Sequence, residues 1–126
     1  METRHLVNEF SVMLDTAHRI RVLLNQRTHK LTGLSLQQVT VMCRIELGDG
    51  MATVSSLAEA NLRTNHTVTA MVNGLEREGL VFRQRNTGGD RRRIFVHLSP
   101  KGHAKVGAFR AMAIHLLASF LGEITQ

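Results

Sequence analysis

The segment covering residues 80–99 constrains the fold more than any other part of this sequence. It carries five arginines and one aspartate around the dipeptide Gly88-Gly89, and apolar residues alternate with polar ones on both sides. Alternation at every second position is typical of half-buried strands, and glycines supply the positive φ that a tight turn needs. The segment therefore predicts a β-hairpin over residues 80–98 with an arginine-rich tip. The residues expected on its core face are Leu80, Phe82, Ile94, Val96 and Leu98.

The charge of the whole chain agrees with a polyanionic partner. Sixteen Lys and Arg residues oppose ten Asp and Glu residues, which gives a formal net charge of +6. Exposed guanidinium groups bind phosphates, and they are favoured in a narrow DNA minor groove. The hairpin and the charge together favour a nucleic-acid partner, and the plainer alternative is a basic surface without a partner.

The remaining composition predicts one cytoplasmic domain over residues 1–126. A chain of this length can bury a substantial core. The single cysteine excludes an internal disulfide and fits a reducing compartment. Residues 1–5 lack the residue order of a signal peptide, and no run of eighteen apolar residues occurs, so we expect no leader and no membrane partner.

Two long amphipathic patterns flank the centre of the chain, over residues 4–28 and 100–124. Their apolar residues recur at alternating spacings of three and four, which is the heptad pattern of helices that pair. Ser99 and Pro100 favour the start of the second helix, in which Gly102 and Gly107 are expected to weaken helix propensity. We predict that both helices serve dimerisation. The seam residues are Leu6, Phe10, Met13 and Ala17 in the first helix, and Val106, Phe109, Ala113, Leu116 and Phe120 in the second.

The region between them, residues 35–98, reads as a DNA-binding lobe. Ser35 and Gln38 form a capping box for a helix that ends at residues 48–50. An extended piece, 51–54, precedes a compact helix over 55–60, and Thr64 caps a third helix that closes at Gly79. Two helices joined by so short a link predict a helix-turn-helix over 55–78, followed by a wing over 80–98.

The residues now show a family resemblance. The stretches Ser56-Leu-Ala-Glu59, 68–80 with its Leu-Glu-x-x-Gly-Leu ending, and 90–102 with Asp-x-Arg and Leu-Ser-x-x-Gly, resemble the MarR family of bacterial transcriptional regulators. The resemblance covers residues 34–103 well. It implies a mainly α fold with a small antiparallel β-wing, that is, an α+β winged helix-turn-helix with dimerisation helices at both ends.

The resemblance also implies a function and a site. Family members are homodimers that bind a pseudo-palindromic operator, usually as repressors, and many release DNA when a small aromatic or phenolic ligand binds. By position, Arg92 matches the wing arginine, and Asp90 matches the acidic residue that shapes the wing. We expect the second helix of the helix-turn-helix in the major groove and the wing at the minor groove or its phosphates. The predicted contacts are Thr64, Asn65, His66, Thr67, Thr69, Ala70, Asn73, Arg85, Arg91, Arg92 and Arg93.

Several alternatives stay open at this stage. Many relatives carry basic residues where this chain has Ala70 and Gly74, so a protein-binding winged helix with weak DNA binding is the second reading. A regulator that senses oxidants through Cys43, or metals through histidines, is the third, although the seven histidines show no zinc-binding spacing. No phosphate loop, nucleophile elbow or acid–base pair indicates an enzyme. No motif indicates a cofactor, and no residue identifies the effector.

Overall fold

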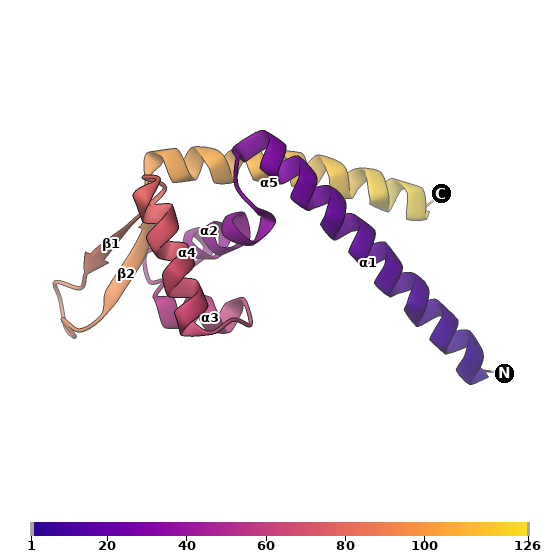
Figure 1. Cartoon of the computed structure of the whole chain (residues 1–126), viewed down its shortest axis with the longest axis horizontal. Coiled ribbons are helices and arrows are strands. Elements are labelled where there is room, and N and C mark those ends of the chain that lie inside the picture. Colours follow the sequence, from indigo (N-terminus) through magenta and orange to yellow (C-terminus); the bar gives the residue numbers. More distant parts are fainter. Residues whose placement is uncertain (1, 126) are drawn as a thin grey trace.

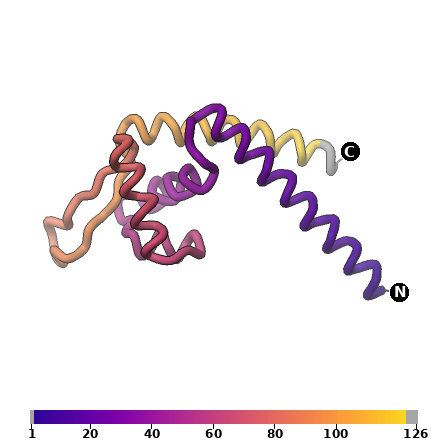
Figure 2. Tube along the Cα trace, viewed as in Figure 1, coloured from indigo at the N-terminus to yellow at the C-terminus, as the bar shows by residue number. Residues whose placement is uncertain are grey.

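The computed structural model describes residues 2–125, with side chains described for residues 2–122. The elements are α1 (Glu2–Thr32), α2 (Leu36–Leu47), α3 (Val54–Ala60), α4 (Asn65–Arg77), β1 (Val81–Arg85), β2 (Ile94–Leu98) and α5 (Pro100–Thr125). Helices α2, α3 and α4 form a lobe with the hairpin at one end, and α5 runs along the lobe (Figure 1). Helix α1 leaves the lobe at a steep angle, and both chain ends lie on the side away from the hairpin (Figure 2). The predicted mainly α fold with a small antiparallel wing is confirmed.

The helix starts follow from local capping. Ser35 and Gln38 exchange side-chain to backbone hydrogen bonds at the start of α2, and the Thr64 hydroxyl accepts from the N–H of Thr67 at the start of α4. Both caps are as predicted. Helix α3 begins at Val54, because Thr53 and Ser56 form a second capping box. The predicted extended piece is therefore one residue too long.

The core face of β2 is the predicted one, with Val96 and Leu98 buried, whereas the core face of β1 is shifted by one residue. The antiparallel register of the hairpin pairs Val81 with Leu98 and Arg83 with Val96. Leu80 is buried in the turn before β1, and Val81, the first residue of β1, is buried as well. The alternation of buried and exposed residues along β1 therefore begins at Val81 and not at Leu80. The predictions for Phe82 and Ile94 were wrong, since their exposed fractions are 44% and 40%. Phe82 lies on the outer face, where its ring stacks on His97 with centroids 5.2 Å apart.

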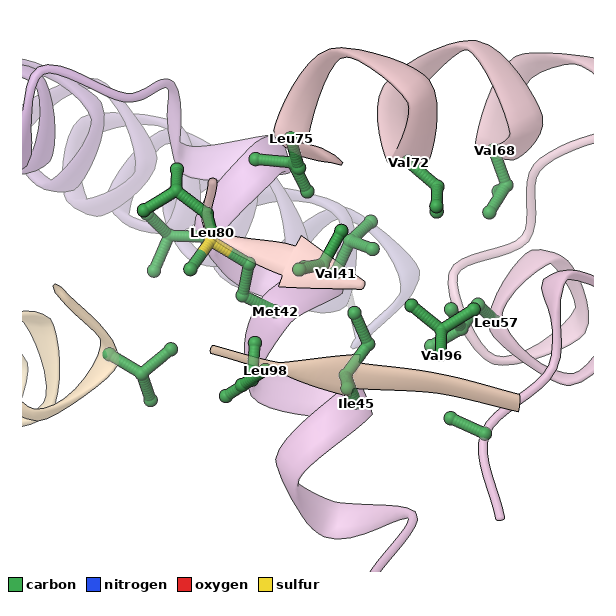
Figure 3. Close-up of a cluster of buried hydrophobic side chains, with 14 of the residues drawn as sticks. Val41, Met42, Ile45, Leu57, Val68, Val72, Leu75, Leu80, Val96 and Leu98 are labelled. Carbon is green, nitrogen blue, oxygen red and sulfur yellow. The ribbon is translucent and has the colours of Figure 1, made fainter. Parts of the chain in front are cut away.

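One hydrophobic core joins the helix-turn-helix to the hairpin. Side chains from α2, α4 and β2 converge with Leu57 of α3 and with Leu80, as Figure 3 shows. The buried residues of α2 and α4 recur at spacings of three and four, so each helix buries one face. Because α4 and β2 pack on the same buried residues, the core fixes their relative position. The buried residues of these helices are Val39, Met42 and Ile45 in α2, and Val68, Val72 and Leu75 in α4.

Gly102 allows α5 to approach the start of the hairpin. A Cβ atom at this position would lie 2.1 Å from the backbone oxygen of Leu80. That same oxygen accepts a hydrogen bond from the N–H of Ser99 at 3.0 Å. The Ser99 hydroxyl in turn accepts from the N–H of Gly102, which confirms Ser99 as the cap of α5. Gly102 therefore serves close packing, and α5 is continuous through Gly102 and Gly107 despite their low helix propensity.

The terminal helices expose apolar surface. In α1, every residue from 2 to 15 is exposed. The other end of α1 is held to α2 by a hydrogen bond from the N–H of Leu36 to the side chain of Asn25, and to α5 by one from Lys105 to the Thr32 carbonyl. Within the described part of the chain, α5 is one helix that is long and apolar enough to cross a membrane by length and composition alone. Its contacts with α1, α2 and β2 show that it packs on the lobe.

Candidate nucleic-acid interface

Helix α4 exposes a polar face at its N-terminal end. Asn65, His66, Thr67 and Ala70 are exposed and Thr69 is half-buried, whereas the opposite face of the helix packs into the core. Amide, imidazole and hydroxyl groups can donate to and accept from base edges. This face has the chemistry that base recognition needs.

The turn between α3 and α4 is tight. Leu62 adopts a positive φ of 53°, which is uncommon for a non-glycine residue, and the N–H of Arg63 donates to the carbonyl of Ala58 at 2.9 Å. Asn65 reaches back across the turn, and its amide nitrogen lies 3.4 Å from the Ser55 hydroxyl. The start of α4 is thus tied to the start of α3.

The loop at the hairpin tip is held by hydrogen bonds of Asn86. Its backbone N–H donates to the Arg93 carbonyl at 2.9 Å, its side-chain amide donates to the Asp90 carbonyl, and its side-chain oxygen accepts from the N–H of Gly88. Gly89 has a φ of +80°, as expected for this turn. Asn86 was not among the predicted site residues, although an Asn two residues before a glycine pair is a known turn signal.

Asp90 binds Arg92 through a single carboxylate oxygen. That oxygen accepts from the backbone N–H of Arg92 at 3.0 Å and from its Nε at 3.2 Å. The backbone hydrogen bond, followed by the side-chain one, lowers the pKa of the Asp90 carboxyl. The pair is therefore intact above the ordinary aspartate pKa, and it is lost only when the pH falls below that value. Arg92 is 92% exposed, and its two terminal amino groups have no partner within the described residues.

The wing and the start of α3 line one groove. A groove of about 450 Å³ is lined by Thr53 and Ser55 on one side and by Arg92 and Arg93 on the other. Ser55 is the residue that Asn65 contacts. The arginines of the wing are therefore next to the start of α3, the first helix of the helix-turn-helix.

Two predicted contact residues have partners within the protein. The side-chain oxygen of Asn73 accepts a hydrogen bond from Arg83 at 2.8 Å, and Arg85 donates to the carbonyl of Arg91 at 3.3 Å. While Arg83 holds that oxygen, Asn73 lacks the acceptor that a bidentate contact to adenine requires. Arg83 also contacts Glu76, with 2.9 Å between Nη1 and Oε1, and the sequence prediction did not include it. In the observed register Arg83 lies on the same face of β1 as the buried Val81, which the alternation in the sequence did not indicate.

The predicted dimer seam is exposed on α1 and displaced on α5. Leu6, Phe10, Met13 and Ala17 are all exposed. On α5, Val106 is fully buried in the core of its own chain and Leu116 is nearly so, so neither is available to a partner, contrary to the prediction. Phe109, Ala113 and Phe120 are half-buried. The exposed apolar positions lie one residue further along the helix, at Ile114 and Leu117.

Cys43 and the histidines are the residues through which oxidants or metals would be sensed. Cys43 is half-buried against the core, and burial raises the pKa of its thiol, which Arg110 and then Arg44 partly oppose. Glu46 binds Arg110 and lies 3.4 Å from Nδ1 of His103. Within the described residues, no group of three or more His, Cys, Asp or Glu side chains is arranged to hold a metal ion.

The state of Cys43 leads to a first prediction. Because the thiolate is the reactive form, we expect Cys43 to be alkylated by iodoacetamide at pH 7.5 at least about tenfold more slowly in the folded protein than in denaturant. Intact mass spectrometry over time measures both rates, and the denatured protein is the control. Equal rates would return Cys43 to consideration as an oxidant sensor.

Comparisons with known proteins agree with the geometry. The family model described as "MarR family" matches residues 32–93. The transcriptional regulator HosA of Escherichia coli is 32% identical over 112 residues, which span 86% of this chain and 82% of HosA.

Solved structures show the same fold. The MarR family transcription regulator SP03579 superposes with a TM-score of 0.83 at 24% identity, over 94% of this chain and 77% of that one. The Staphylococcus aureus MepR–DNA complex superposes with a TM-score of 0.75 at 20% identity, over 90% of this chain and 81% of MepR. At these identities the likeness concerns the fold.

Proposed function

Because the chain belongs to the MarR family of transcriptional regulators, we propose that it is a repressor that binds a pseudo-palindromic operator as a homodimer. This is a family of regulators and not of enzymes. The observation that carries the proposal is the groove between Arg92 and Arg93 of the wing and the start of α3, where Ser55 also contacts Asn65, the first residue of α4. MepR, which shares the fold, has been solved as a complex with DNA.

Helix α4 and the wing contact different grooves of the DNA in this proposal. The exposed polar face at the start of α4, from Thr64 to Ala70, enters the major groove and reads base edges. The side chains of Arg85 and of residues 91–93 approach the adjacent minor groove or its phosphates. Asp90 contributes by holding Arg92 in one orientation, since an exposed ion pair adds little to stability.

The homodimer is supported by unpartnered apolar surface. Leu6, Phe10 and Met13 on α1, together with Ile114 on α5, are exposed in a single protomer. Exposed apolar patches of this kind mark interaction sites, and most soluble oligomers are twofold symmetric. Two recognition helices in such a dimer read half-sites one helical turn apart, about 34–36 Å.

Regulation by a small ligand completes the proposal. A groove of about 230 Å³ lies between α1, α2 and α4, and its lining includes Arg21, Arg63 and Met71. Guanidinium groups beside an apolar floor suit an aromatic or phenolic molecule with a negative charge. The protein would act in the cytoplasm and lie on the nucleoid while bound to its operator.

The central test combines a substitution with salt. We expect Arg92→Ala to weaken binding to a duplex selected by the wild-type protein by about 1–3 kcal/mol, and to reduce the slope of log K against log salt by about 1. Fluorescence anisotropy at several salt concentrations measures both. Arg4→Ala, which removes the same charge from the far end of α1, should leave the affinity nearly unchanged. A wild-type affinity that does not depend on salt would favour the protein-binding alternative.

A further inference from the structure

Arg83 differs from the other hairpin arginines because its side chain is turned into the protein. It pairs with Val96 in the register of the hairpin, so both side chains leave the sheet on the same face, and Val96 is buried. The side chain of Arg83 is 25% exposed, whereas that of Arg92 is 92% exposed. A charge this far from water is stable only when it is paired and hydrogen-bonded.

Both partners of Arg83 belong to α4. Nη1 lies 2.9 Å from Oε1 of Glu76, and Nη2 donates to Oδ1 of Asn73 at 2.8 Å. Asn73 and Glu76 are three residues apart, so they lie on the same face of the helix. The planar guanidinium holds two donors in a rigid fork, which fixes direction as well as distance. Asn73, Glu76 and Arg83 are called the α4–wing clamp below.

We propose that Arg83 is a positioning residue, and that the α4–wing clamp sets the separation between α4 and the wing. This inference rests on the proposed function. A two-stranded hairpin has little stability of its own, and Arg83 occupies the middle pair of this ladder, between the buried base and the exposed tip. A protein that contacts two grooves at once binds more tightly when both contacts are already spaced correctly. Arg83 therefore raises DNA affinity without touching DNA.

Replacing Glu76 is a test in which long-range electrostatics and the clamp predict opposite changes in DNA affinity. Glu76→Gln removes a negative charge close to the duplex, which on charge alone would tighten binding. The clamp predicts that binding weakens, by about threefold to tenfold, because the fork loses its charged partner. Glu78→Gln is the matched control, since within the described residues the side chain of Glu78 has no hydrogen-bond partner. We expect that control to bind as tightly as the wild type or more tightly.

A double-mutant cycle separates positioning from direct contact. Arg83→Met should weaken binding in the wild-type background and have little further effect when Arg92→Ala is already present, because the wing contact that it positions is gone. Arg83→Lys, which can restore one of the two contacts, should give an intermediate affinity. The probe is the duplex selected by the wild-type protein, measured by anisotropy. Additive losses, or a Glu76→Gln protein that binds as tightly as Glu78→Gln, would overturn the positioning role.

The free protein gives an independent readout. Without the clamp, the hairpin amides that bond across the strands, including the Asn86 N–H, should exchange with deuterium at least about threefold faster at an unchanged melting temperature. If the wild type bound no duplex, the proposed function would fail, and this measurement would still decide whether the clamp holds the wing. Unchanged exchange in both Glu76→Gln and Arg83→Met would refute the clamp.

Discussion

Replacing Gly102 with alanine is expected to destabilise the protein by about 3 kcal/mol and to lower its melting temperature by roughly 10 °C. The added methyl group would lie 2.1 Å from the oxygen of Leu80 and 3.2 Å from its carbonyl carbon. Both are backbone atoms, so no side chain can rotate away. The first turn of α5 must then move off the lobe, which breaks the hydrogen bond from Ser99 to Leu80. Thermal unfolding followed by circular dichroism measures the effect.

Gly107→Ala is the control for this prediction. Gly107 lies in the same helix, is exposed, and has no heavy atom within 4 Å of an added Cβ. Alanine there should stabilise the helix by about 0.5–1 kcal/mol, because it restricts the unfolded chain and is the better helix former. A Gly102→Ala protein that melts at the wild-type temperature would show that α5 does not lie against Leu80.

The second large effect is expected at the seam. Phe10→Glu should raise the dissociation constant of the homodimer by about a hundredfold or more, since each dimer would bury two unpaired carboxylates in place of two aromatic rings. Operator binding should fall with it. Sedimentation velocity over a concentration series measures the association, and anisotropy with the selected duplex measures the binding.

Val12→Glu is the matched control at the seam. Phe10 and Val12 are similarly exposed in the protomer, 61% and 63%. Because they are two positions apart in an α-helix, their side chains point to nearly opposite sides of it. If the dimer seam lies on the Phe10 side of α1, the Val12→Glu protein should remain a dimer. A wild-type protein that sediments as a monomer at every concentration would contradict the homodimer itself.

Features encoded within a few residues could be predicted from the sequence. The caps at Ser35 and Thr64 depend on side chains three positions from the groups they bind, so the starts of α2 and α4 were predicted correctly. The same rule applied to Thr53 and Ser56 would have found the start of α3, which adjacent serines obscured. The core faces of α2 and α4 followed from helical periodicity.

Features that depend on contacts between distant segments could not be predicted. The core face of β1 was misassigned because two consecutive residues are buried there, Leu80 in the turn and Val81 in the strand. The role of Gly102 depends on the position of Leu80 in another element. The partners of Arg83 depend on how the hairpin docks on α4, and periodicity within one element carries no information about that docking.

If the chain forms the proposed homodimer, the amino-terminal half of α1 would make its folded state sensitive to protein abundance. Residues 2–15 of this helix are exposed along their whole length in one chain, and isolated helical segments of about 12–15 residues are marginally stable in water. In the proposed homodimer, dilution that separates the two copies would therefore also melt this segment. A cell that makes little of this regulator would hold it as partly unfolded single chains, open to proteases at their amino ends, and a small rise in synthesis would convert them into the ordered form.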